Sequence, residues 1–109
     1  MDSPPTEIAL AVTVRLLAPA QGGRRRPVAS GYRPVCLVPG VTGDETVIGL
    51  CLLELANELL PGTEAEGTLR FAPVVSEIVR SVLKIGTEFM LAEGRHVVGH
   101  ARVLGFADR

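Results

Sequence analysis

Aromatic residues are scarce in this sequence of 109 residues, which has no tryptophan, one tyrosine and three phenylalanines. The core must therefore consist mainly of valine, leucine, isoleucine and alanine. With 47% hydrophobic residues, the chain is nevertheless too apolar for an intrinsically disordered protein. The scarcity of aromatic side chains also argues against a surface that binds nucleic acid by stacking on its bases.

Cysteine and histidine are equally scarce, which limits metal and redox chemistry. Cys36 and Cys51 lack the Cys-x-x-Cys spacing of zinc and redox sites, so we expect two buried thiols in a reducing cytosol. His96 and His100 have no third ligand, so we expect no metal and no cofactor. Because no serine or cysteine stands in a recognisable nucleophile motif, we expect a protein that is not an enzyme.

Long hydrophobic runs are also missing. The longest apolar stretch, residues 47–60, holds two glutamates and is too short to cross a bilayer. The first residues, MDSPPTE, lack the basic start of a secretory signal. We therefore expect a cytoplasmic protein with no membrane partner, in which residues 1–6 form a disordered tail.

Turn-forming residues are abundant, with twelve glycines and eight prolines, and apolar residues alternate between them with period two. This pattern predicts strands at residues 8–17, 32–38, 67–72, 87–94 and 96–106. Residues 73–86 instead carry apolar residues at helical spacing and predict a short helix that ends near Gly86. Residues 47–60 fit either a buried pair of strands or a helix from about Leu52 to Leu60.

Together these elements predict a single domain over residues 7–109. Many short strands joined by turns are typical of a small barrel. The expected fold is all-β, a six-stranded antiparallel closed β-barrel with one short inserted helix.

Charge is unevenly distributed, although the net charge is only −1. Residues 8–43 hold five arginines and no acid, whereas residues 44–66 hold six acids and no base. Arg24, Arg25 and Arg26 follow two glycines at a predicted hairpin tip. Guanidinium groups match phosphate oxygens in geometry and charge. The run therefore either contacts phosphate or an acidic partner, or simply keeps a loop in solution; both interpretations remain open.

Five motifs occur in a recognisable order: GGR followed by Pro27, then GYRP, VTG, PG and F…EG…VG. In this order they resemble the C-terminal barrel of the elongation factor Tu and elongation factor 1-alpha family, which is the third domain of a GTPase. The resemblance covers residues 7–106 and implies the translation elongation factor C-terminal-domain fold. It also implies contacts with the backbone of tRNA and with the GTPase domain.

Carried over position by position, the family's RNA-contacting residues fall on Arg24, Thr42 and Gly94. We add the remaining arginines near these motifs as candidate RNA- or partner-binding residues: Arg25, Arg26, Arg33 and Arg95. In this chain Val35 and Ala72 replace a glutamine and a lysine of the family, and Arg95 and His96 replace a Gly-Arg pair.

The chain has no phosphate-binding loop of the GxxxxGK[S/T] type, so we expect neither GTPase activity nor a bound nucleotide. We predict a stand-alone, non-catalytic binding module with a translation-associated role, which contacts tRNA-like backbone or a translation GTPase. The alternative is a protein–protein adaptor or a homodimeric barrel with no RNA role, which would use the leucine-rich run at residues 50–60 and the predicted helical segment at residues 73–86.

Overall fold

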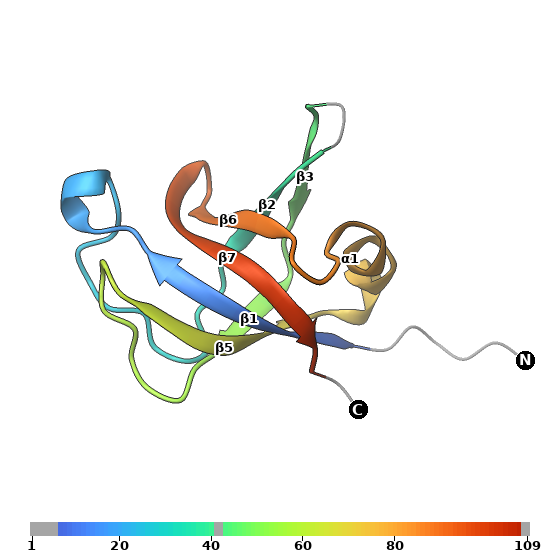
Figure 1. The fold of residues 1–109 in the computed structure, drawn as a ribbon, viewed down its shortest axis with the longest axis horizontal. Coiled ribbons are helices and arrows are strands. Elements are labelled where there is room, and N and C mark those ends of the chain that lie inside the picture. Colours follow the sequence, from blue (N-terminus) through green and yellow to red (C-terminus); the bar gives the residue numbers. More distant parts are fainter. Residues whose placement is uncertain (1–6, 41–42, 108–109) are drawn as a thin grey trace, which may run out of the picture.

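The computed structural model describes residues 7–40 and 43–107, and this part of the chain forms one antiparallel sheet and one short helix (Figure 1). The strands are β1 (Ile8–Leu16), β2 (Val35–Pro39), β3 (Glu45–Ile48), β4 (Cys51–Glu54), β5 (Glu64–Phe71), β6 (Glu88–Glu93) and β7 (His96–Phe106). The helix is α1 (Ser76–Val82), and two 3-10 turns, η1 (Pro19–Gln21) and η2 (Pro73–Val75), precede β2 and α1. The expected tail and Thr42 lie outside the described residues.

Strand β1 lies between β7 and β5 in a sheet whose order is β3-β2-β6-β7-β1-β5-β4. Its predicted alternation is confirmed, because the side chains on one face are almost completely buried: Ile8, Leu10, Val12, Val14 and Leu16. Apolar residues of every other strand complete the same core, in which Phe71 and Phe89 are the largest buried side chains. The core therefore lies on the inner face of the sheet.

The sheet is curled, because its two edge strands are consecutive in the chain. Only Gly49 and Leu50 separate β3 from β4, which are at opposite ends of the strand order. Three peptide steps span at most about 11 Å, so the two edges approach each other at this point. Isolated bridges from Tyr32 to Leu53 and from Val28 to Leu59 also connect the segment before β2 to β4 and to the residues that follow it.

The all-β class with one short helix is confirmed, but the expected closed six-stranded barrel is not. The sheet has seven strands and forms a curled half-barrel. The difference arises at residues 47–60, which hold the end of β3 and the whole of β4 and contain no helix. Leu50 has a left-handed backbone, with φ of 56°, which ends one strand and allows the next to join the other edge.

The predicted helix is confirmed as α1, but it presents a narrower apolar face than the spacing indicated. Val79 and Leu83 are fully buried, whereas Ile78 is 43% exposed. Figure 1 shows α1 beside the C-terminal end of β7, where the Arg80 guanidinium lies 5.7 Å from the ring centroid of Phe106. Among the described residues no helix has both the length and the apolar composition needed to cross a membrane.

Candidate functional site

The segment from Leu17 to Pro34 joins β1 to β2 without a hairpin, since β1 pairs with β5 and β7. The arginine run is therefore not at a hairpin tip. The two glycines before it have a local cause. Gly22 has φ of 90°, and a Cβ on Gly23 would lie 2.2 Å from the backbone oxygen of Leu17. Only glycine fits such a close approach. The chain turns at this point, immediately before Arg24.

Arg24 points to the end of β6, where it forms a cluster with Tyr32 and Glu93. Its guanidinium forms an ion pair with the Glu93 carboxylate. The Tyr32 hydroxyl donates a hydrogen bond of 2.6 Å to the same carboxylate oxygen. The guanidinium also lies over the Tyr32 ring, 5.1 Å from its centroid. We call these three residues the Arg24–Tyr32–Glu93 cluster.

The electrostatics of the cluster follow from its hydrogen bonds. The Tyr32 hydroxyl bond and the Arg24 guanidinium hold the pKa of Glu93 below its ordinary value, despite partial burial. Burial and the bond to Glu93 raise the pKa of Tyr32. Arg24 donates further hydrogen bonds to the backbone oxygens of Arg26 and Pro27. Arg24 therefore holds the loop in place through contacts within the chain, and its carried-over phosphate contact stays a prediction.

A second contact fastens the same loop to the start of β7. The His96 Nε2 atom lies 2.5 Å from the Gly22 carbonyl oxygen. A carbonyl oxygen only accepts hydrogen bonds, so Nε2 carries a proton. Glu93 and His96 are paired across the β6–β7 turn, so the loop is held on both sides of Gly94 and Arg95.

Gly94 has a structural reason to be glycine. It is the first residue of the two-residue turn between β6 and β7 and has φ of 61°. Two-residue hairpin turns of this kind favour glycine at that position, because other residues are strained there. The family's backbone contact at this position stays a prediction.

The structure brings five of the seven predicted site residues to one end of the molecule, on the loop and on the neighbouring turn: Arg24, Arg25, Arg26, Gly94 and Arg95. Arg25, Arg26 and Arg95 are exposed. We call Arg24, Arg25, Arg26 and Arg95 together the arginine end. Arg33 is not part of it, since Arg33 lines a separate surface hollow of about 290 Å³ with Cys51 and Arg70.

Sequence reasoning missed Glu93 and the contact of His96. The Tyr32 ring is partly buried against the core, and its hydroxyl is bonded to Glu93. Glu93 lies 69 residues from Arg24 along the chain, so no local pattern connects them. The available signal was indirect: residues 8–43 hold no acid, so an ion-pair partner of Arg24 had to come from a distant part of the chain.

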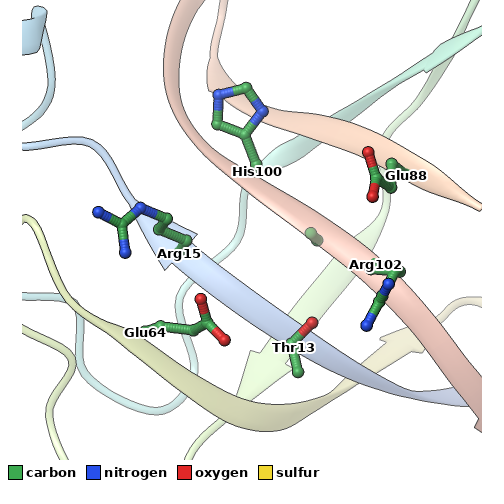
Figure 2. A pocket seen from close by; sticks show the side chains of 7 residues that line it. Thr13, Arg15, Glu64, Glu88, His100 and Arg102 are labelled. Atoms are coloured by element: carbon green, nitrogen blue, oxygen red, sulfur yellow. The ribbon is translucent and has the colours of Figure 1, made fainter.

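A larger hollow, of about 320 Å³, lies on the outer face of the sheet (Figure 2). Charged and polar side chains of four neighbouring strands line it: Thr13, Arg15, Glu64, Glu88, His100 and Arg102. Arg15 faces Glu64 on one side and His100 on the other. Figure 2 shows these side chains spread over the sheet surface. We interpret this hollow as a solvated polar face.

Within residues 7–40 and 43–107, no group of three or more metal-ligating side chains could hold a metal ion. Compared with known proteins, the chain matches no family model and no curated protein. The resemblance to elongation factor C-terminal domains therefore rests on the order of motifs in the sequence.

Proposed function

We propose that this protein is a non-catalytic binding module whose arginine end contacts the phosphate backbone of a tRNA-like RNA. One observation carries the proposal. The Arg24–Glu93 ion pair and the His96–Gly22 hydrogen bond hold the arginine loop beside the Arg95 turn. The arginine end and Glu93 have a formal charge of +3, four arginines against one glutamate, in a chain whose net charge is −1.

The arginines divide into two roles in this proposal. Arg24 positions the loop through the Arg24–Tyr32–Glu93 cluster. Arg25, Arg26 and Arg95 are exposed, and in the described part of the chain none of them forms an ion pair. Exposed guanidinium groups bind phosphate whatever the base sequence of the nucleic acid, which suits contact with an RNA backbone. The motif order shared with the elongation factor family supports a translation-associated partner.

A fluorescence titration with bulk tRNA at two salt concentrations tests the proposal. The variant Arg25→Ala/Arg26→Ala should bind more weakly, and its affinity should depend less on salt. Each phosphate contact contributes about 0.7–0.9 to the slope of log affinity against log salt, so losing two should reduce it by about 1.5. The matched control, Arg15→Ala/Arg102→Ala, removes the same charge from the outer sheet face and should retain the wild-type slope.

Two results would contradict the proposal. One is the absence of tRNA binding by the wild-type protein even at low salt. The other is an equal loss of affinity in both double variants, because binding would then follow net charge rather than the arginine end.

A second candidate function, self-association, is favoured by exposed apolar residues around α1. Large apolar side chains on α1, beside it and at the end of β7 are 38% to 75% exposed: Val74, Ile78, Ile85, Leu104 and Phe106. We call these five residues the α1 face. In the leucine-rich run, Leu53 and Leu59 are buried, whereas Leu50 and Leu60 at its two ends are 62% and 54% exposed.

Light scattering at increasing protein concentration tests this second candidate. A homodimer through the α1 face should dissociate in Ile78→Glu/Ile85→Glu, while a wild-type protein that stays monomeric at all concentrations would exclude it.

A further inference from the structure

The two cysteines come face to face inside the curled sheet. Cys36 on β2 and Cys51 at the start of β4 are 0% and 2% exposed, and their Sγ atoms are 3.8 Å apart. A disulfide has an S–S length of about 2.05 Å, so the sulfurs would have to approach by about 1.8 Å. Side-chain rotation can supply much of that movement. The sequence holds no other cysteine, so only one intramolecular disulfide can form.

This pair lies between two strands that are not hydrogen-bonded neighbours in the curled sheet. Strand β4 is the last in the strand order and β2 the second, so no strand ladder joins them. The isolated bridges at Tyr32–Leu53 and Val28–Leu59 are the backbone pairings described between these two parts of the chain. A covalent bond between the cysteines would therefore connect the two sides of this seam.

Cys51 lies nearer the surface than Cys36, and its thiol is the more readily ionised one. It is among the residues that line the hollow of about 290 Å³ next to Arg33. The hydrogen bond from Cys36 and the Arg33 charge lower the pKa of Cys51, although burial opposes this. The hydrogen bond that the Cys51 thiol donates to the Pro34 carbonyl, at 3.1 Å, also opposes ionisation. The bond to Cys51 and burial raise the pKa of Cys36.

We propose that Cys36 and Cys51 are an oxidation site, at which a hydroperoxide converts the two thiols into a disulfide that joins β2 to β4. The Cys51 thiolate sulfur attacks a peroxide oxygen, the O–O bond breaks, and protonation releases one water and leaves a sulfenic acid. The Cys36 sulfur then attacks the Cys51 sulfur, the S–O bond breaks, and the Cys36 proton leaves with the hydroxyl as a second water. One hydrogen peroxide and two thiols thus give one disulfide and two waters.

The test uses the full chain, folded and reduced, treated with one equivalent of hydrogen peroxide. The protein is then unfolded in the presence of an alkylating reagent and its intact mass is measured. We expect a loss of two hydrogen atoms and no alkylation. We also expect the melting temperature to rise by on the order of 10 °C, because the bond closes a loop of about 15 residues. Dithiothreitol should reverse all three changes.

Single alanine variants test the order of the steps. In Cys36→Ala the reaction should stop at a sulfenic acid on Cys51, which dimedone traps, whereas Cys51→Ala should show little dimedone labelling. A cooperative thermal melt of each reduced variant shows that the variant is folded. If either variant fails to fold, the mass measurement on the wild-type protein still tests the proposal. Three results with the wild-type protein would overturn the proposal. They are a mass increase from added oxygen with no disulfide, a disulfide between two chains, and two thiols that can still be alkylated after excess peroxide.

Discussion

At the scale of single residues, Glu93 connects two segments that are distant in the sequence. Its carboxylate accepts from the Arg24 guanidinium and from the Tyr32 hydroxyl. Hydrogen bonds to a charged group are stronger than neutral ones. Solvent weakens them here, because the side chains of Arg24 and Glu93 are 23% and 40% exposed.

Replacing Glu93 by glutamine should destabilise the protein modestly. The amide keeps the size of the carboxylate but loses the charge, so we expect the free energy of unfolding to fall by about 1 kcal/mol in a denaturant titration. The control is Glu88→Gln on the same strand, whose side chain forms no ion pair among the described residues. Equal effects of the two changes would show that the Arg24–Tyr32–Glu93 cluster adds nothing to stability.

The titration of Tyr32 reports the same cluster directly. Burial and the bond to Glu93 raise the pKa of Tyr32 above the ordinary tyrosine value of about 10. The chain has one tyrosine and no tryptophan, so phenolate absorbance follows this residue alone. We expect a midpoint clearly above about 10 in the folded protein, and a lower one in Glu93→Gln.

The raised pKa also fixes the direction of the stability change with pH. Tyr32 contributes its full stabilisation below its unfolded pKa and loses it as the pH rises through the folded pKa. Unfolding should therefore become easier above about pH 10. A folded-state midpoint at or below about 10 would contradict the Tyr32–Glu93 hydrogen bond.

At the scale of elements, β7 contains two glycines with different surroundings. A Cβ on Gly99 would lie 2.7 Å from the backbone oxygen of Arg15 in β1, whereas a Cβ on Gly105 would meet nothing within 4 Å. The backbone of β1 cannot move aside as easily as the end of a flexible side chain can. The absence of a side chain at Gly99 therefore lets β7 and β1 approach closely.

Alanine at Gly99 should accordingly cost about 1–3 kcal/mol, a typical cost for overpacking. Alanine at Gly105 should change stability little, and denaturant titrations of the two variants give the comparison. Similar stability in both variants would show that β1 and β7 do not approach as closely as the structure has them.

The elements also show what sequence periodicity can and cannot predict. The alternation at residues 8–17 and the helical spacing at residues 73–86 predicted β1 and α1, because each has one buried face. Residues 47–60 were ambiguous because the backbone at Leu50, rather than a hydrophobic period, divides them into two strands. The Arg24–Glu93 contact joins the ends of unrelated elements, and no local pattern contains it.

At the scale of the whole molecule, the two candidate surfaces lie at opposite ends of β7. The arginine end includes the turn just before His96, and the α1 face includes Phe106 at the last position of the strand. Ten strand steps span up to about 33 Å. A partner that covers one surface therefore leaves much of the other in solvent. Mapping which residues a partner contacts thus distinguishes RNA binding at the arginine end from self-association through the α1 face.

An NMR titration of the isotope-labelled protein with bulk tRNA maps the contact residue by residue, and a chain of 109 residues is small enough for it. If the arginine end binds RNA backbone, the amide signals of residues 22–27 and 93–96 should shift as tRNA is added and return as salt is raised. Signals of the α1 face should stay in place. Shifts confined to Val74, Ile78 and Phe106, or no shifts at low salt, would contradict an RNA-binding role for the arginine end.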